Sequence, residues 1–585
     1  MPSSFQAFCR RSATLPALGA FLALLFLCGC AQLPQNVERP ISTAITSPAS
    51  GTALADLVQQ RRQADKARYE SGFMLMGGPQ AAYGSRLALI EGAQKTLDLQ
   101  YYAIHADAST GRLMRGLRGA AERGVRVRVL LDDFHTTGRD AAVLGLAFIP
   151  NIEMRLFNPI AGSRDSRISR FLNSIDDASR IQQRMHNKLF IADNVLAVTG
   201  GRNLGDAYFG NAANANFIDV DVLAAGPIVQ DLSRSFDSYW NNERAYPVQS
   251  LITREELQAM RDRARKADQE LAEESARAQD ANGNPKPPDG EPRPNAPPTA
   301  AQRARAWDEK PLDLRTATFV WAPAVMLADK PGKIPADSDP TNAKAPGLVV
   351  SRPDDKAGTS RGAASLEAAS DRAANGDTVV EGLLQLIGQA RTDLVIISPY
   401  FVPGKDMLRA FSEARGRGVR IRVLTNSLAS NDVLPAHSGY AKTRKPLLEN
   451  GMELYELRPD TDAFRPGWSL LSKGSRAALH TKAMVFDREA VFIGSFNLEP
   501  RSAWINTEAG LYIESPELAE RLVAYMATGV VPANSYHVLL DANGEVVWET
   551  VTDGQTVRYQ DEPDTDFRRR FVADLWKVLP IESQL

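Results

Sequence analysis

Cysteine is almost absent from this chain of 585 residues. The only three copies are Cys9, Cys28 and Cys30, and all lie close to the N-terminus. If the chain is cleaved before Cys30, the mature protein keeps a single cysteine. It can then form no disulfide within itself and no cysteine-based metal site.

An excess of charge of one sign is also absent. The chain has 68 Lys and Arg residues against 70 Asp and Glu residues, a formal net charge of -2. A dedicated nucleic-acid-binding protein is expected to carry a strong basic field, so we expect no nucleic-acid partner, although a local basic site remains open. The apolar content of 44% and the length are those of a globular protein with two to four domains.

A hydrophobic run long enough to span a membrane is missing from the N-terminal segment. The apolar run at residues 15–27 is too short, follows Arg10 and Arg11, and ends in Leu27-Cys28-Gly29-Cys30. These features are typical of a signal peptide, with an uncleaved N-terminal anchor as the alternative. The Leu-x-Gly-Cys pattern resembles a bacterial lipoprotein signal. It implies that residues 1–29 are removed and that a lipidated Cys30 anchors the protein on the exported side of a bacterial membrane, inner or outer.

One stretch of the sequence occurs twice. Residues 185–204 read MHNKLFIADNVLAVTGGRNL and residues 479–498 read LHTKAMVFDREAVFIGSFNL. The same polar residues and glycine recur 294 positions apart (480 minus 186), whereas the apolar residues between them differ. Because the two copies share their polar side chains and differ in their apolar ones, the shared residues indicate a common chemical role rather than a common packing arrangement. The repeated pairs are His186 and His480, Lys188 and Lys482, Asp193 and Asp487, Gly200 and Gly494, and Asn203 and Asn497.

Local signals predict a β-hairpin around each copy. Residues 189–192 and 483–486 are apolar runs typical of buried strands. Asp193-Asn194 is predicted as a two-residue turn before a returning strand at 195–199, a register that places His186 opposite Gly201. Side chains alternate along a strand, so His186 and Lys188 point the same way, and Asn203 arrives beside them. An imidazole, an ammonium and an amide at one end of a hairpin suit an anionic ligand such as phosphate.

The rest of the chain divides around the two hairpins. Strand patterns at 97–102 and 125–131 alternate with helical spacing in the first copy, and those at 392–399 and 419–424 do so in the second. This alternation predicts the α/β class, with a parallel or mixed sheet in each copy. The predicted divisions are a leader at 1–29, a tether and helix at 30–75, a first repeat at 76–250, a flexible linker at 251–375 with a packed segment near 316–333, and a second repeat at 376–585.

The C-terminal residues 559–585 carry apolar side chains at helical spacing. They are Phe567, Phe571, Leu575 and Leu579. We expect an amphipathic helix that docks on the second repeat. A helix that lies on a membrane is the alternative.

The pattern H-x-K-x4-D-x6-G-[GS]-x-N, present twice, resembles the phospholipase D superfamily. The stretch TNSLASNDVLPAHSGY and the terminal LPIESQL are most similar to bacterial cardiolipin synthases. The resemblance implies two phospholipase D-like α-β-α sandwich repeats, related by a pseudo-twofold axis and sharing one active site. It also implies transfer of a phosphatidyl group through a phosphohistidine intermediate, with no metal and no other cofactor.

Cleavage of a phosphodiester needs a nucleophile, a proton for the leaving oxygen and neutralisation of charge at phosphate. The resemblance assigns His186 as nucleophile and His480 as acid and base, although the symmetry of the motif leaves the reverse open. Lys188, Lys482, Asn203 and Asn497 are expected to hold the phosphoryl oxygens. Carboxylates that orient the histidines are expected at Glu508 and, with a different spacing in the first copy, at Asp219. For Asp193 and Asp487 both a catalytic and a structural role are open.

The function implied is synthesis of cardiolipin from phosphatidylglycerol and a second phospholipid, at a membrane surface. The alternative is a phospholipase D-type hydrolase, which differs in whether water or a lipid alcohol enters the second step. A nuclease or another phosphodiesterase is disfavoured by the near-neutral charge, and a non-enzymatic lipoprotein by the two complete motifs. The sequence leaves the two lipids and the oligomeric state undetermined.

The lipoprotein signal generates the first testable prediction. Replacing Cys30 with serine removes the sulfur that would carry the acyl chains, so Cys30→Ser should leave the membrane fraction or accumulate as an unprocessed precursor. Fractionation of cells combined with intact mass measurement distinguishes these products from wild type. An unchanged mature mass and unchanged membrane partition would contradict the signal.

Overall fold

The computed structural model describes residues 33–44, 51–162, 164, 178–277, 297–335, 347–351, 361–461, 464 and 475–578. The predicted leader, Cys30 and the Pro-rich centre of the linker lie outside these residues. Within the described residues, no helix combines the length and the apolar character needed to cross a membrane.

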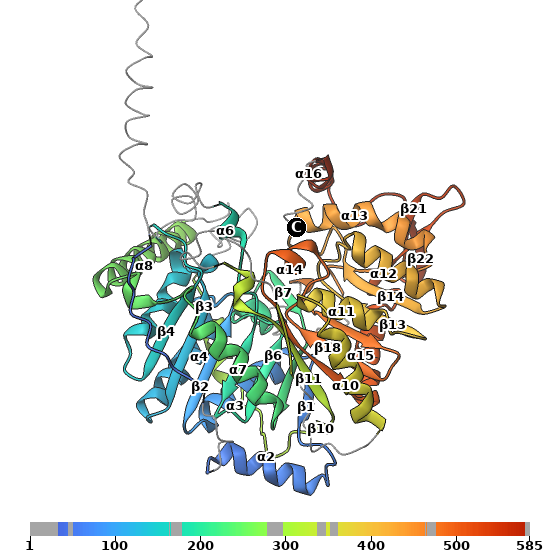
Figure 1. Ribbon diagram of the computed structural model, residues 1–585. Coiled ribbons are helices and arrows are strands. Elements are labelled where there is room, and N and C mark those ends of the chain that lie inside the picture. The colour runs from blue at the N-terminus through green and yellow to red at the C-terminus, as the bar shows by residue number, and fades with distance from the viewer. Residues whose placement is uncertain are drawn as a thin grey trace, which may run out of the picture.

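Two large mixed sheets form the body of the molecule (Figure 1). The first has nine strands in the order β10-β1-β8-β6-β5-β2-β3-β4-β9. The neighbouring strands β2, β3 and β4 are parallel to one another. The pairs β2–β5, β5–β6 and β6–β8 are each antiparallel. Their bounds are β1 Gly72–Met76, β2 Thr96–Tyr101, β3 Arg126–Asp132, β4 Ile152–Phe157, β5 Leu189–Ala192, β6 Leu196–Gly200, β8 Asp221–Ala225, β9 Ala245–Pro247 and β10 Val320–Trp321.

The second sheet repeats this plan and extends it. It has eleven strands in the order β12-β11-β19-β18-β17-β13-β14-β15-β20-β21-β22, and its strands β19 to β15 correspond in order to β8 to β4 of the first sheet. The bounds are β11 Ala324–Asp329, β12 Leu348–Val350, β13 Asp393–Ile397, β14 Arg420–Asn426, β15 Glu453–Leu457, β17 Ala483–Phe486, β18 Ala490–Gly494, β19 Ala509–Glu514, β20 Ser535–Leu540, β21 Val546–Thr552 and β22 Gln555–Tyr559.

Helices cover the faces of both sheets and leave three apolar cores. An outer core on the first repeat packs α3 and α4 against β2 and β3, and an outer core on the second packs α11, α12 and α13 against β13 and β14. The third core contains α7, α15 and residues of both sheets, such as Leu130 and Val395, so it joins the repeats. The bounds are α2 Ala53–Ala64, α3 Pro79–Gly92, α4 Ala108–Glu122, α6 Ala178–Gln182, α7 Ile228–Trp240, α8 Arg254–Arg277, α9 Ala300–Asp308, α10 Arg361–Ala373, α11 Val379–Ile387, α12 Lys405–Gly416, α13 Leu434–Glu449, α14 Pro500–Trp504, α15 Pro516–Gly529 and α16 Phe567–Val578.

This arrangement confirms the predicted fold class, an α/β molecule of two related repeats with helices on both faces of each sheet. All residues of β2 and β13 are buried, and the apolar run of β13 is typical of a parallel strand covered on both faces. β2 instead buries the polar residues Asp98 and Gln100 between its apolar ones. The packed segment near 316–333 contains two strands, one in each sheet. β10 pairs with β1 in the first sheet, and β11 pairs with β19 in the second.

The two predicted hairpins are β5–β6 and β17–β18. Asp193 and Asn194 have φ values of 49° and 55°, and the Val195 N–H donates to the Ala192 carbonyl at 3.1 Å, as in a type I′ turn. Val195 is then an additional residue, because Ala192 pairs with Leu196. The predicted register is therefore wrong by one residue. The second hairpin has the same extra residue, since Phe486 pairs with Ala490.

The turn carboxylates of Asp193 and Asp487 bind backbone rather than the histidine end of the hairpin. Asp193 accepts N–H groups of Gln94, Lys95 and Thr96 at 2.7–3.0 Å, and Asp487 accepts those of residues 391–393 at 2.8–3.1 Å. His186 and Asp193 are seven positions apart along a nearly extended chain, roughly 20 Å. This placement favours the structural alternative for both aspartates, since each holds the start of a central strand against the turn.

The turn contacts predict a loss of stability without a loss of chemistry. Asp193→Ala and Asp487→Ala each leave three backbone N–H groups without their acceptor, so each should lower the free energy of unfolding by about 2–3 kcal/mol. Urea unfolding measures this change, and Asp193→Asn, which keeps one acceptor oxygen, should lose less. Substantially lower turnover by a fully folded alanine variant at low temperature, with an unchanged unfolding midpoint, would contradict the structural role.

Candidate active site

The two motif histidines meet where the repeats join. His186 precedes β5 and His480 precedes β17, so both lie at the end of the hairpin away from the turn. The His186 N–H donates to the Thr507 carbonyl of the second repeat at 2.9 Å, and the His480 N–H donates to the Ile218 carbonyl of the first at 2.8 Å. Next to this second contact, β16 (Arg476–Leu479) pairs in parallel with β7 (Ala215–Ile218). Backbone pairing between the repeats therefore fixes both histidines.

Each histidine is bound by a carboxylate from the other repeat. His186 Nδ1 lies 2.9 Å from Glu508 Oε2, and His480 Nδ1 lies 2.6 Å from Asp219 Oδ2. A carboxylate at Nδ1 keeps the proton of a neutral imidazole on that nitrogen and leaves the lone pair on Nε2. Neither repeat completes a half-site with its own residues, a crossing that the sequence did not reveal.

The two carboxylates differ in their surroundings. Glu508 accepts hydroxyl protons from Ser495 at 2.6 Å and Ser502 at 2.8 Å. Burial by itself raises the pKa of Glu508, but His186, Lys188 and the hydrogen bonds outweigh it and lower the pKa below its usual range. For Asp219, burial prevails over Lys482 and Arg202 and raises the pKa to about 6. Glu508 is therefore the more firmly ionised partner.

The motif lysines are buried beside the histidines. Lys188 Nζ donates to the His186 carbonyl and Lys482 Nζ to the His480 carbonyl, each at 2.6 Å. Burial lowers the pKa of Lys188 to about 7 and that of Lys482 to about 8. Since a nearby anion favours the charged form, a phosphate bound here raises both values.

Burial also favours the neutral form of both imidazoles. It lowers the pKa of His186 to about 4, and that of His480 well below its usual value. Glu508 opposes the shift at His186, whereas Lys482 and Lys188 add to it at His480. A neutral imidazole with a free Nε2 lone pair is the form that can attack phosphorus.

The motif asparagines flank the site and already have protein partners. Asn203 accepts the Ala103 N–H at 3.2 Å and donates to the Tyr208 hydroxyl at 3.0 Å. Asn497 donates to Glu499 Oε1 at 3.0 Å, and burial raises the pKa of Glu499 to about 7. A direct contact of either amide with phosphate stays a prediction.

Aromatic rings that the sequence motif does not reveal lie against the histidines. The Tyr102 ring lies edge-on to His186 at 5.1 Å, and the rings of Tyr208 and Phe217 lie 5.3 and 5.1 Å from His480. Lys188 Nζ lies 5.6 Å from the Tyr102 ring centre. Tyr102 directly follows the parallel strand β2, a position where site residues gather, which is the one signal that could have found it. Among the described residues, no group of three or more His, Cys, Asp or Glu side chains is arranged to hold a metal ion.

Both hairpins fall within regions that match known proteins. Residues 87–240 and 383–528 match a family model described as cardiolipin synthase, PLD-like domain. The chain is 35% identical over 509 residues to cardiolipin synthase C of Escherichia coli (strain K12), which covers 86% of this chain and 93% of that protein. This chain belongs to the PLD-like cardiolipin synthase family.

Two further comparisons cover most of the length of this PLD-like protein. An uncharacterised protein of Helicobacter pylori (strain ATCC 700392 / 26695) is 29% identical over 569 residues, 96% of this chain and 98% of that protein. Among solved structures, phosphatidylserine synthase of Haemophilus influenzae Rd KW20 has a TM-score of 0.49 and 13% identity, and it covers 90% of this chain and 100% of that one. The predicted membership of the phospholipase D superfamily is confirmed by the family match and the Escherichia coli relative.

The buried neutral histidines predict how stability depends on pH. In the unfolded chain histidine binds a proton below about pH 6.5, whereas folded His186 does so only below about pH 4. The free energy of unfolding should therefore fall as pH drops through this window, with up to about 3 kcal/mol of the loss arising from His186. His480 acts in the same direction.

Urea unfolding of wild type and His186→Gln across that pH window tests the assignment. The variant lacks the titrating group, so its free energy of unfolding should vary less steeply with pH. Equal slopes for the two proteins would show that His186 is not held neutral by burial.

Proposed function

We propose that this protein is a phosphatidyltransferase that makes cardiolipin from phosphatidylglycerol and a second phospholipid. The observation that carries the proposal is the pair of His–Lys half-sites joined by crossed carboxylates. The similarity of the chain to a protein named cardiolipin synthase C, 35% identity over 86% of this chain, also supports the proposal. Two neutral imidazoles beside two buried ammonium groups provide what transfer at a phosphodiester requires.

In the first step, His186 Nε2 attacks the phosphorus of the donor lipid. A P–N bond forms, the bond from phosphorus to the headgroup oxygen breaks, and His480 gives a proton to the leaving alkoxide. The anionic substrate raises the pKa of His480 and so supplies its acid form, which the short contact with Asp219 stabilises. The charges of Lys188 and Lys482 are suited to stabilising the phosphoryl oxygens.

In the second step, neutral His480 takes a proton from the hydroxyl of the acceptor lipid. The acceptor oxygen attacks phosphorus, the P–N bond to His186 breaks, and the product leaves with the site restored. Glu508, the more firmly ionised carboxylate, stabilises the positive charge that His186 carries as it forms the intermediate. This difference between the two carboxylates favours His186 as nucleophile.

Hydrolysis is the second candidate, because water in place of the acceptor hydroxyl yields phosphatidic acid. The aromatic rings of Tyr102, Tyr208 and Phe217 beside the histidines favour a lipid alcohol over water. A nuclease is the least favoured candidate because the net charge is -2.

We place the protein on the exported side of a bacterial membrane, anchored through a lipidated Cys30. The Leu27-Cys28-Gly29-Cys30 sequence after a short apolar run supports this location. An anchor confines the site to the surface that holds both lipid substrates. The Cys30→Ser experiment tests it independently of activity.

Vesicles that contain labelled phosphatidylglycerol, incubated with the purified protein, test the reaction. We expect labelled cardiolipin in excess of labelled phosphatidic acid, and no effect of a chelator. His186→Ala and His480→Ala should each abolish turnover, and the double variant should be scarcely worse, since the two residues act as a unit. His537→Ala is the matched control, because His537 lies on β20 against Tyr455, away from the site.

The intermediate separates the two histidine roles. His480→Ala should trap acid-labile, base-stable label on His186, because no base then activates the acceptor. Label on His480 in the His186→Ala protein would reverse the roles. Substantial turnover in either single variant, loss of turnover on chelation, or phosphatidic acid as the main product would each contradict the proposal as stated.

A further inference from the structure

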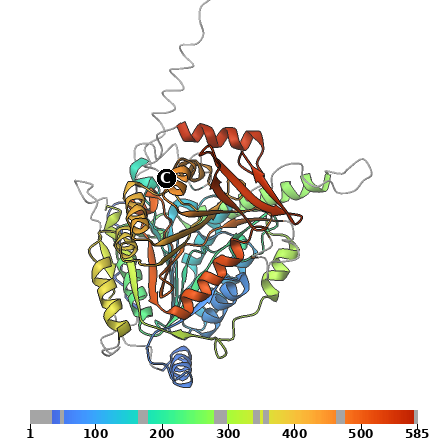
Figure 2. The same cartoon turned by 90° about the vertical axis from the view of Figure 1, so that its right-hand side faces the viewer.

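The C-terminal helix α16 turns a row of large apolar side chains outward. Phe567, Phe571 and Leu575 are 74%, 59% and 55% exposed, and Val572 beside them is 37% exposed. Positions four apart share one face of a helix, so these side chains form a continuous stripe. The helix docks on the second repeat as predicted, but through its opposite face, where Ala573 is 2% exposed. In Figures 1 and 2, α16 lies at the margin of the molecule, above α13.

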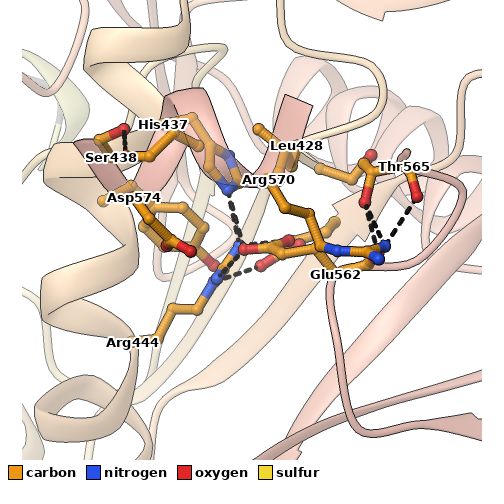
Figure 3. A network of polar contacts seen from close by, with 12 residues as sticks. Leu428, His437, Ser438, Arg444, Glu562, Thr565, Arg570 and Asp574 are labelled. Atoms are coloured by element: carbon orange, nitrogen blue, oxygen red, sulfur yellow. Dashed lines mark hydrogen bonds and ion pairs between the residues drawn. The ribbon is translucent and has the colours of Figure 1, made fainter. Parts of the chain in front are cut away.

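Polar contacts fix which face of α16 points outward (Figure 3). Ser438 of α13 donates to the Ala573 carbonyl at 2.8 Å, and Arg569 Nε donates to the Leu428 carbonyl at 2.9 Å. In the segment before the helix, Glu562 accepts from Arg444 at 2.5 Å and contacts His437 Nε2 at 3.1 Å. Rotating the helix to bury the stripe would break these contacts, several of which are buried, so the outward orientation is built into the fold.

The face of α16 opposite the stripe contacts a loop that leads toward the active site. Arg569 also contacts the carbonyl of Asn431, so α16 holds the loop that follows β14. That loop continues into Asp432, whose carboxylate accepts the Tyr400 hydroxyl at 2.9 Å and is close enough to Lys482 for the two charges to interact. In Figure 1, α16 and α13 lie toward the same end of the molecule as α14, which follows the motif residue Asn497.

The charge of α16 indicates what covers the stripe. The helix carries four cationic residues against one acidic residue, and Arg568, next to Phe567, is exposed. Lys577 pairs with that acid, Asp574, at 2.8 Å. Phenylalanine and leucine on one face with arginine at its margin are typical of a helix that lies in the interface of an anionic membrane. A second copy of the chain would bring a second set of these cations against the first.

We propose that α16 is a membrane-docking helix, whose apolar stripe enters an anionic phospholipid surface and holds the rim of the active site against it. This inference rests on the proposed function only in that the lipids of that surface are the substrates. The lipidated N-terminus then attaches the protein to the membrane, and α16 orients the active site relative to the membrane surface.

A fluorophore whose emission reports water contact, attached at Phe571→Cys in the full-length protein, tests the docking. On vesicles of phosphatidylglycerol and phosphatidylcholine its emission should shift to the blue, and lipids that carry a quencher should quench it. Val349→Cys, an exposed apolar position on the edge strand β12, is the matched control and should show neither effect. The parent protein, labelled in the same way, gives the background from native cysteines.

The effect on turnover is measured with Phe567→Ser, Phe571→Ser and Leu575→Ser combined. Because the three side chains are exposed, the thermal unfolding temperature should not change. We expect turnover on vesicles at limiting lipid to fall about tenfold or more, as expected from the lost burial of three large side chains. Turnover of monomeric short-chain phosphatidylglycerol should stay at the wild-type level, as it should for Val349→Ser on both substrates.

Each result decides the inference. An emission that is unaffected by vesicles overturns it. An emission that is already blue-shifted without vesicles also overturns the inference. If that shift depends on protein concentration, a second copy of the chain covers the stripe. If it does not, the C-terminal residues after α16 cover it. Equal losses on vesicles and on monomers also overturn the inference. If wild type turns over neither lipid but the label still enters the membrane, the proposed function fails and the docking helix stands.

Discussion

The crossed pairing of histidine and carboxylate is the interaction on which the rest of the site depends. His186 is oriented by Glu508 and His480 by Asp219, so each repeat supplies the carboxylate that orients the histidine of the other. The pairing has a required geometry, and the common core of α7, α15 and the two sheets maintains it. The repeats are therefore halves of one site rather than two domains placed side by side.

The charges of the site follow from this burial. Two lysines, two histidines and two carboxylates are enclosed together, and burial lowers the pKa of both lysines although the carboxylates oppose the shift. A phosphate placed among them restores the protonation that burial opposes. In the proposed reaction, the binding of an anionic substrate therefore also favours the acid form of His480.

The sequence was sufficient for the motif, the two repeats and the α/β class. The polar residues repeated with His186 and His480 indicate the motif and the two repeats, because they are kept while the apolar residues change. The alternation of strand and helix patterns indicates the α/β class. It was insufficient where the answer depends on contacts across the repeats: nothing local to Asp219 or Glu508 says which histidine each will meet. The predicted pairing of the hairpin strands is wrong by one residue. The turn was correctly identified, but Val195 follows it as an extra residue, so Ala192 pairs with Leu196. The apolar spacing of Phe567 and Phe571 predicted a helix but not which face it buries, since docking through Ala573 depends on polar partners in α13.

The short passage from β10 to β11 has a mechanical consequence. Only Ala322 and Pro323 separate a strand of the first sheet from a strand of the second, and β11 continues to Asp329, whose carboxylate accepts the Glu508 N–H at 2.9 Å. The chain thus connects the two sheets a short distance from the carboxylate that binds His186. A connection of two residues keeps the neighbouring ends of β10 and β11 within roughly 11 Å of each other, so any movement of one sheet relative to the other must pivot at this edge. Glu508, held by the last residue of β11, lies close to that pivot and is displaced little by such a movement.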